Sequence, residues 1–224
     1  MSDLTLIIPA KNEVESLPQV LDELKDFNFK INIVLESSDK LTIESIKNYN
    51  CNIIYQDSKG YGDALKKGID SVDTELFCIF VADGSFNPKE LDHMISKIKN
   101  DNNDFVFASR YEKNCGSDDD TVITFIGNYI FTFLGKFFFK LEITDILYTF
   151  VVARTSCAKK LELTAKDFSF CVELPIKAKR ANYRICTSKS YERARLAGKK
   201  KVNAFKDGLK ILFSMVKLFF KVKV

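Results

Sequence analysis

The sequence has no tryptophan, only four prolines and a single histidine, His93. One histidine excludes most catalysis that depends on histidine and also excludes His-rich metal sites. Six cysteines are present, but none forms a C-x-x-C pair, so a zinc site or a disulfide framework is disfavoured and reduced, mostly buried thiols are expected. The start of the chain also lacks the charged and apolar pattern of a secretory signal.

Acidic residues are nearly missing from the last part of the chain. From Ile176 onward there are 15 Lys and Arg but only two acids, Glu192 and Asp207, whereas residues 1–175 carry a net charge of −9. This polarity indicates that the C-terminal part meets an anionic partner such as phosphates or a membrane surface. A solvated basic face is the simpler alternative.

Short apolar runs alternate with helix-like segments in the first 110 residues, which make up about half of the 224-residue chain. Continuous apolar strands joined by helical crossovers predict an α/β fold whose mostly parallel sheet has helices on both faces. The expected strands are residues 4–10, 31–36, 51–56, 76–82 and 104–110.

Polar residues follow several of these strands. Sheets of this kind bind ligands beyond the carboxyl ends of their strands. The fourth run leads into the segment FVADGSFNPKEL, so Asp83 stands where a ligand carboxylate is expected. The residues expected at these strand ends are Pro9, Asn12, Glu36, Gln56 and Asp83.

Two apolar segments lie in the second half of the chain. Residues 123–143 are long enough to span a membrane, but Asn128, Lys136, Lys140 and two glycines favour a helix partly buried on the domain. Residues 204–224 have helical period, with a lysine stripe beside a broad apolar face. That pattern is typical of a helix lying in a membrane interface, although a helix packed on the domain is the alternative.

Seven segments resemble, in order, the sequence blocks of family 2 glycosyltransferases. The later blocks resemble the polyprenyl-phosphate branch, which includes dolichol-phosphate mannose synthase. The resemblance covers roughly residues 4–215. The segments are LIIPAKNEVESLPQVL, KGYGDALKKGI, FVADGSFNPKEL, DFVFASRYEK, ITDILYTFVVARTSCAKKL, FSFCVELPIKAKRANYRI and YERARLAGKKKVN.

The resemblance implies a GT-A domain over residues 1–203 and a membrane-associating amphipathic helix over residues 204–224. It implies an inverting enzyme that moves a sugar from a nucleotide-diphosphate sugar to a lipid phosphate, on the cytoplasmic face of the cell membrane. Mg²⁺ or Mn²⁺ would neutralise charge on the leaving diphosphate as a Lewis acid. Because the tail lysines alternate with Phe and Leu, no nucleic-acid partner is expected; assembly as a homo-oligomer is left open.

The resemblance also implies roles for individual residues. Asp83, helped by Ser85, would hold the metal, and Arg195 and Lys201 would bind the phosphates. Arg110 would lie near a donor or acceptor phosphate, and Asp145 and Glu173 would lie on the acceptor side. Asp83, Asp145 and Arg195 are the candidate catalytic residues. The other donor-binding candidates are Pro9, Ala10, Asn12, Glu13, Glu36, Lys59 and Ala82.

Two departures from the family pattern keep alternatives open. Family members usually have Asp where this chain has Val81, and their second strand ends in Asp-Asp-x-Ser where this chain has Leu35-Glu36-Ser37-Ser38. A degenerate nucleotide-binding module without activity is therefore one alternative. A transferase acting on a glycan hydroxyl is another, and it would need Asp145 or Glu173 as a general base, which an anionic phosphate acceptor does not need.

Overall fold

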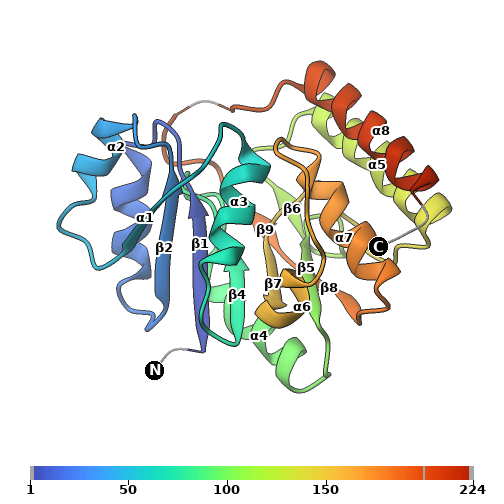
Figure 1. The fold of residues 1–224 in the computed structure, drawn as a ribbon, viewed down its shortest axis with the longest axis horizontal. Helices are drawn as coiled ribbons and strands as arrows, with labels where there is room; N and C mark the ends of the chain where they lie inside the picture. Colours follow the sequence, from blue (N-terminus) through green and yellow to red (C-terminus); the bar gives the residue numbers. More distant parts are fainter. Residues whose placement is uncertain (1–2, 199, 222–224) are drawn as a thin grey trace.

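A central sheet of seven strands, in the order β3-β2-β1-β4-β7-β5-β8, carries helices on both faces (Figure 1). The computed structural model describes residues 3–198 and 200–221. The predicted α/β class with a mostly parallel sheet is confirmed. The strands are β1 (Leu4–Pro9), β2 (Lys30–Leu35), β3 (Asn52–Tyr55), β4 (Leu76–Ile79), β5 (Phe105–Ser109), β6 (Gly116–Ser117), β7 (Val151–Arg154), β8 (Ile185–Lys189) and β9 (Tyr191–Glu192).

The helices pack on both faces of the sheet. They are α1 (Ser16–Leu24), α2 (Lys40–Ser45), α3 (Tyr61–Asp70), α4 (Leu91–Lys99), α5 (Val122–Phe139), α6 (Thr155–Lys159), α7 (Phe170–Arg180) and α8 (Ala204–Phe220), with a 3₁₀ turn at Pro88–Glu90. Apolar residues of α1 and α4 form the core on one face of the sheet. Residues of α3, α6, α7 and α8 form the core on the other face.

Strands β3, β2, β1 and β4 pair in parallel, so their carboxyl ends share one edge of the sheet. β7 is the exception, since it runs antiparallel between β4 and β5. The five predicted strands exist; β2 is shifted by one residue, and the other four are shorter than their apolar runs. The ladder of β4 ends at Ile79, and the chain continues through Phe80, whose N–H donates to the Ile7 carbonyl at 2.9 Å, toward Asp83.

The six cysteines are free, as expected from their spacing. Cys78 and Cys171 are buried, and the other four are partly buried. They therefore serve as small apolar side chains rather than as a disulfide framework.

Helix α5 packs on the domain with an inverted pattern. Its fully buried positions are Asn128, Thr132 and Gly135, whereas most of its large apolar side chains face outward and only Phe131, Leu134 and Phe139 pack partly against the core. By length and composition it could span a membrane, and only 22% of the apolar window is buried. The expected partly buried helix is observed, but the stripe that it buries is polar and small.

Helix α8 begins at Ala204, where the second segment was expected, and packs back onto the domain. Asp207, Ile211, Met215 and Leu218 form its buried stripe. It runs beside α5 (Figure 1), and the Phe138 and Phe219 rings lie 5.5 Å apart, centroid to centroid. Residues 222–224 of the predicted tail helix lie outside the described residues.

Candidate active site

A basic segment crosses the carboxyl edge of the sheet directly over the end of β4. We call residues 193–198 and 200–201 the basic strap. The Leu196 N–H donates to the Asp83 carbonyl at 2.8 Å, and the Arg193 N–H donates to the Ser85 carbonyl at 2.9 Å. Gly84 lies between them with a φ of 82°, and a Cβ there would lie 2.5 Å from the Leu196 side chain. Glycine is therefore needed for the strap to approach this closely.

The Asp83 side chain is held in a tight local turn. One carboxylate oxygen, Oδ1, accepts hydrogen bonds from the Ser85 N–H at 3.1 Å and from the Ser85 hydroxyl at 2.8 Å. The other oxygen, Oδ2, lies 3.4 Å from the Arg195 guanidinium. Asp83 is thus fixed on one side by Ser85 and has its second oxygen directed toward the strap.

Arg195 is surrounded by carboxylates from distant parts of the chain. Its Nε and Nη2 donate to the two oxygens of Asp119 at 3.3 and 3.0 Å. Burial lowers the pKa of the Arg195 guanidinium, but the hydrogen bond with Asp119 and the charges of Asp83 and Glu13 outweigh burial and raise it. Likewise burial raises the pKa of Asp119, and hydrogen bonds from Arg195 and Lys200 more than offset this and lower it. Both groups stay ionised at neutral pH.

The end of the strap reaches the end of β1. The Lys201 ammonium donates to the buried Glu13 carboxylate, whose other oxygen accepts from the Ser16 hydroxyl at 2.7 Å. Lys200 lies 3.2 Å from the Asp119 carboxylate. The strap therefore brings three cations, Arg195, Lys200 and Lys201, to one edge of the sheet, where acids that are distant in sequence hold them.

A pocket of about 240 Å³ opens between the ends of β1 and β2. Asn12 in its wall has a left-handed φ of 53°, and its N–H donates to Asp39 at 2.7 Å. Lys11 and Glu36 pair across it at 3.0 Å. The pocket is lined by Ala10, Lys11, Asn12, Glu36, Ser38, Asp39, Lys40 and Leu41.

Residues 5–162 match the model of the family described as glycosyl transferase family 2. The match covers well over half of the 224 residues. The chain belongs to glycosyl transferase family 2. Its enzyme class, a glycosyltransferase, and its GT-A fold follow from this membership and from the structures that it is similar to.

Relatives and solved structures agree with this assignment. An uncharacterized glycosyltransferase of Mycobacterium tuberculosis is 23% identical over 200 residues, 89% of each chain. A dolichyl-phosphate hexose transferase of Haloferax volcanii is 25% identical over 219 residues, 96% of this chain and 93% of the relative.

The structural similarity is higher than the sequence similarity. Glucosyl-3-phosphoglycerate synthase of M. tuberculosis, solved with Mn²⁺, UDP and glucosyl-3-phosphoglycerate, has a TM-score of 0.77 at 12% identity and covers 96% of this chain and 79% of its own. Mannosyl-3-phosphoglycerate synthase of Rubrobacter xylanophilus has a TM-score of 0.73 at 14% identity, covering 97% and 72%.

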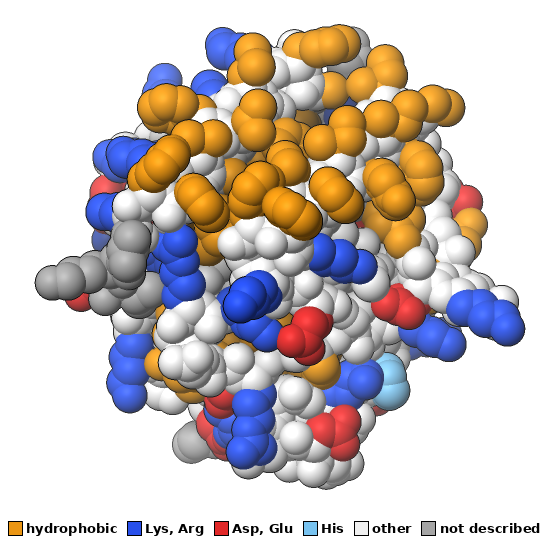
Figure 2. All heavy atoms as spheres, turned by 90° about the vertical axis from the view of Figure 1, so that its right-hand side faces the viewer, with side chains coloured by type: hydrophobic (Ala, Val, Ile, Leu, Met, Phe, Trp, Pro, Cys, Tyr) orange, Lys and Arg blue, Asp and Glu red, His pale blue; other side chains and the backbone are white. Residues whose placement is uncertain are grey.

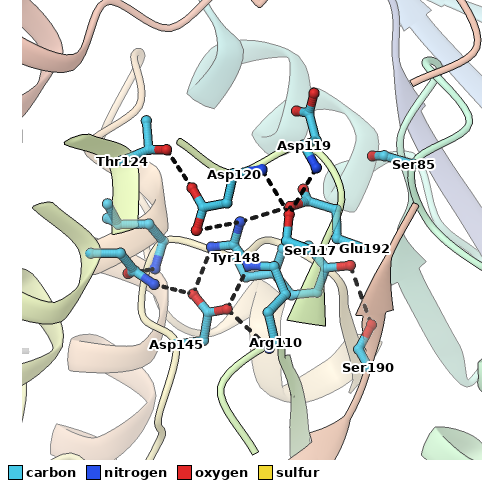
Figure 3. A network of polar contacts seen from close by, with 12 residues as sticks. Ser85, Arg110, Ser117, Asp119, Asp120, Thr124, Asp145, Tyr148, Ser190 and Glu192 are labelled. Carbon is cyan, nitrogen blue, oxygen red and sulfur yellow. Dashed lines mark hydrogen bonds and ion pairs between the residues drawn. The ribbon is translucent and has the colours of Figure 1, made fainter. Parts of the chain in front are cut away.

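In this family 2 enzyme, Arg110 and Asp145 form the centre of a buried polar network (Figure 3). Arg110 donates from Nε and Nη2 to the Asp145 carboxylate at 2.7 and 3.0 Å, and from Nη1 to Glu192 at 2.9 Å. Burial lowers the pKa of Arg110, but Asp145 and Glu192 outweigh it and raise it well above the usual value. The expected proximity of Arg110 to a substrate phosphate stays a prediction, because carboxylates occupy its donors here.

The same network joins α5 to the loop that carries Asp119. The Asn128 amide of α5 donates to Asp145 at 2.5 Å. The Ser117 hydroxyl donates to Glu192 and accepts from the Asp119 N–H at 3.1 Å. Contacts through Arg110, Glu192 and Ser117 thus connect Asp145 to the loop that carries Asp119.

The remaining predicted residues lie in different surroundings. Glu173 accepts from the N–H groups of Thr164 and Ala165, between 2.7 and 3.0 Å, and lies 3.0 Å from the Lys177 ammonium, in a second pocket beside α8. Lys59 lies in the loop that precedes α3, and its side chain is exposed. Pro9 ends β1, and Ala82 is buried beside Asp83.

Sequence reasoning missed Asp119 and Lys200 as members of this site. The acidic run 118–120 was visible in the sequence, but it looked like an ordinary loop. Asp119 and Arg195 are 76 residues apart, and no local pattern links them. The run of acids close to the fifth strand was the available signal.

Within residues 3–198 and 200–221, no group of three or more His, Cys, Asp or Glu side chains is arranged to hold a metal ion. In nucleotide sites Mg²⁺ and Mn²⁺ are bound by one or two carboxylates, waters and substrate phosphates. Asp83, with one oxygen bound by Ser85 and the other directed toward the strap, fits such a single-carboxylate site.

Proposed function

We propose that this enzyme transfers a sugar, with inversion, from a nucleotide-diphosphate sugar to a lipid phosphate such as a polyprenyl phosphate. The observation that carries the proposal is the meeting of Asp83 and Arg195 at 3.4 Å on the carboxyl edge of the sheet. Their positions, 112 residues apart, converge where α/β sheets bind ligands. This arrangement supports a diphosphate site whose cations come from the strap.

The pocket beside β1 and β2 is the proposed site of the nucleoside. Its lining offers amide, carboxylate and backbone groups from Ala10, Asn12 and Glu36, which suit a base and a ribose. Pro9 and Glu13 border the same strand end. Lys201 pairs with Glu13, and it would move to the diphosphate when the donor binds.

The proposed metal is Mg²⁺ or Mn²⁺, held by Asp83 and steadied through Ser85. The ion would supply positive charge to the leaving diphosphate. Arg195 adds charge-assisted hydrogen bonds to the same oxygens, and it is already oriented by Asp119. Positive groups fixed before the reaction stabilise the developing charge without reorganising during the reaction.

A phosphate acceptor suits the limited set of bases at the site. The Asp145 carboxylate accepts hydrogen bonds from Arg110 and Asn128, and its side chain is fully buried. It is therefore poorly placed to take a proton from a sugar hydroxyl. A sugar hydroxyl would need a base to remove its proton, whereas a phosphate oxygen is already anionic at neutral pH.

The surface of α5 and α8 supports a membrane-bound acceptor. Figure 2 shows apolar side chains gathered over one side of the molecule, bordered by lysine and arginine. A continuous exposed apolar surface of this kind marks an interaction site. We name it the α5–α8 face; it comprises Val122, Ile123, Phe125, Ile126, Tyr129, Ile130, Phe133, Phe137 and Phe138 of α5 and Phe205, Leu209, Leu212, Phe213, Val216, Phe219 and Phe220 of α8.

We infer that this face lies in the membrane interface, on the cytoplasmic side, and keeps the enzyme peripheral. Residues 204–224 would then act together with α5 rather than alone. The dolichyl-phosphate hexose transferase of H. volcanii supports a lipid-phosphate acceptor by its name. The phosphoglycerate synthases support a soluble acceptor instead, so the acceptor has to be tested directly.

The test is a transfer assay with UDP-glucose or GDP-mannose as donor and Mn²⁺ or Mg²⁺. Acceptors are a polyprenyl phosphate in vesicles, 3-phosphoglycerate, or none. We expect a glycolipid phosphate to form with the first acceptor only, and Asp83→Asn to abolish it. Asp92→Asn, an exposed acid on α4, is the matched control that should retain transfer. Transfer only to 3-phosphoglycerate or to a glycan would overturn the lipid acceptor, and nucleotide binding without transfer or hydrolysis would indicate a non-catalytic module.

A further inference from the structure

A second pocket lies between α8, α7 and the segment that precedes α7. Its volume is about 510 Å³, larger than the pocket beside β1. Five of its lining residues are lysines, contributed by both sides of the pocket. They are Lys166, Lys177, Lys210, Lys217 and Lys221.

Two acids line the same pocket and neutralise only part of this charge. Glu173 is occupied by the Thr164 and Ala165 N–H groups and by Lys177. Asp167 lies 3.7 Å from Lys210. The pocket therefore keeps a net positive charge from its lining residues.

Three of the lysines have no carboxylate partner. Across residues 3–198 and 200–221, no acid lies within ion-pair distance of Lys166, Lys217 or Lys221. These three exposed lysines come from the segment before α7 and from the C-terminal part of α8 and its cap, and they line one cavity. Such a cavity attracts a compact anion with several acceptor oxygens, of which phosphate is the common case.

The pocket opens at the border of the α5–α8 face. Leu209 and Phe213 line it, and both also belong to the face, with 70% and 71% of their surface exposed. At 100° per residue, Lys210, Lys217 and Lys221 fall on one flank of α8, between the outward apolar side chains and the buried stripe. An anion in this pocket would therefore sit at the depth where lipid headgroups meet acyl chains.

We infer that this pocket binds the phosphate headgroup of an anionic membrane lipid while the α5–α8 face contacts the acyl chains. The inference rests on the membrane docking in the proposed function, and it assigns the pocket that contains Glu173 to a lipid of the bilayer rather than to the acceptor. Its occupant is a structural lipid of the bilayer, because the apolar side chains at the pocket mouth suit a ligand with attached chains. A lipid bound there would orient the enzyme on the membrane and hold the sheet edge at a fixed distance from the membrane surface.

The test compares vesicles that have matched surface potential but different anions, phosphatidic acid or the carboxylate of oleate. We expect the wild-type protein to bind phosphatidic acid vesicles about tenfold more tightly, because a phosphate offers the lysines more acceptor oxygens than a carboxylate does. Lys166→Gln with Lys217→Gln should remove this preference. The matched control, Lys136→Gln with Lys140→Gln, removes the same charge from exposed positions at the end of α5 and should weaken both vesicle types equally.

Each outcome has a defined meaning. Equal binding of both vesicle types by the wild-type protein, or a preference that survives Lys166→Gln with Lys217→Gln, overturns the headgroup site while leaving membrane docking intact. Failure to bind either vesicle overturns the docking on which the site rests. If glycerol 1-phosphate stabilises the wild-type protein thermally as well as short-chain phosphatidic acid does, the ligand is a soluble phosphate and the lipid inference fails.

Discussion

The sheet edge and the α5–α8 face treat their side chains in opposite ways. At the sheet edge nearly every charge has a partner, so that Arg195, Lys200 and Lys201 are held by Asp83, Asp119 and Glu13. On the α5–α8 face large apolar side chains are exposed, while the polar Asn128 and Thr132 are buried beneath them. The charges of the first region are held in place by their partners, whereas nothing in the described part of the chain covers the second.

The two regions are joined rather than independent. Asn128 of α5 donates to Asp145, which binds Arg110, and Arg110 reaches Glu192 and the loop of Asp119 (Figure 3). The buried polar stripe of α5 therefore has a physical reason, because it completes a network that would otherwise contain unsatisfied groups. Because the polar side of α5 is turned toward this network, most of the apolar side chains on its other side are exposed.

The largest expected effect falls on the sheet edge. Arg195→Gln removes the cation that contacts both Asp83 and Asp119, and we expect the rate of sugar transfer to fall about a hundredfold or more. Arg193→Gln is the control on the same strap, since Arg193 pairs with Glu23 instead. Steady-state kinetics of both variants decide this, and equal losses would show that the strap, not the Arg195 charge, matters.

The next effect tests the link between the regions. Asp145→Asn removes a buried partner of Arg110, and we expect the free energy of unfolding to fall by about 3 kcal/mol. Asp73→Asn removes an exposed partner of Lys30 and should cost less than about 1 kcal/mol. Urea denaturation measures both. If Asp145→Asn is as stable as the wild-type protein but inactive, Asp145 acts directly on the substrate, as a hydroxyl acceptor would require.

A smaller effect is expected on the α5–α8 face. Phe213→Gln removes an outward aromatic side chain, and vesicle binding should weaken about tenfold to a hundredfold through lost apolar burial. Tyr55→Gln, exposed on the edge strand β3, should bind vesicles like the wild-type protein. A vesicle sedimentation assay gives the ratio. Unchanged binding of Phe213→Gln would separate α8 from the membrane and leave the face without its proposed partner.

The smallest effect concerns Glu173, one of the two acids that line the lysine-rich pocket. Burial raises its pKa, but hydrogen bonds from Ala165 and Thr164 and the Lys177 ammonium outweigh burial, so the pKa is lowered in the folded protein. A carboxyl group with a lowered folded pKa stabilises the fold above its unfolded pKa, near 4.5, and this contribution is lost as pH falls through the folded value. Glu173→Gln should therefore cost about 1–2 kcal/mol at pH 7. The difference from the wild-type protein should shrink in acid, as thermal melts from pH 7 to pH 3 can show. A difference that does not change with pH would contradict this assignment.

Some of this organisation could be predicted from sequence, and the reason is local periodicity. Apolar runs with helical crossovers located β1 to β5, and the strand-end rule located Asp83 next to the sheet edge. The antiparallel β7 could not be found in this way, because its short run, Val151–Arg154, does not encode which strands it will separate. Asp119 was missed for a similar reason, since its role depends on a partner 76 residues away.

The helix over residues 123–143 shows a second limit. Composition predicted a helix in partial contact with the domain, but the usual rule would bury its aromatic side chains. Tertiary partners explain why the polar stripe faces inward, since Asn128 binds Asp145 and Leu147, and Thr132 accepts from the Ile146 N–H. The lysine stripe of α8 was visible from the sequence, whereas the pocket that it lines needs Lys166 and Lys177 from other segments.

The most direct test of the central claim is a calorimetric titration of UDP and GDP into the wild-type protein and Asp83→Asn, with and without Mn²⁺. We expect the wild-type protein to bind one of the two nucleotides about tenfold or more tightly with Mn²⁺, and Asp83→Asn to lose that dependence while staying folded. Retention of the full Mn²⁺ dependence by Asp83→Asn would show that the diphosphate and its metal are held elsewhere.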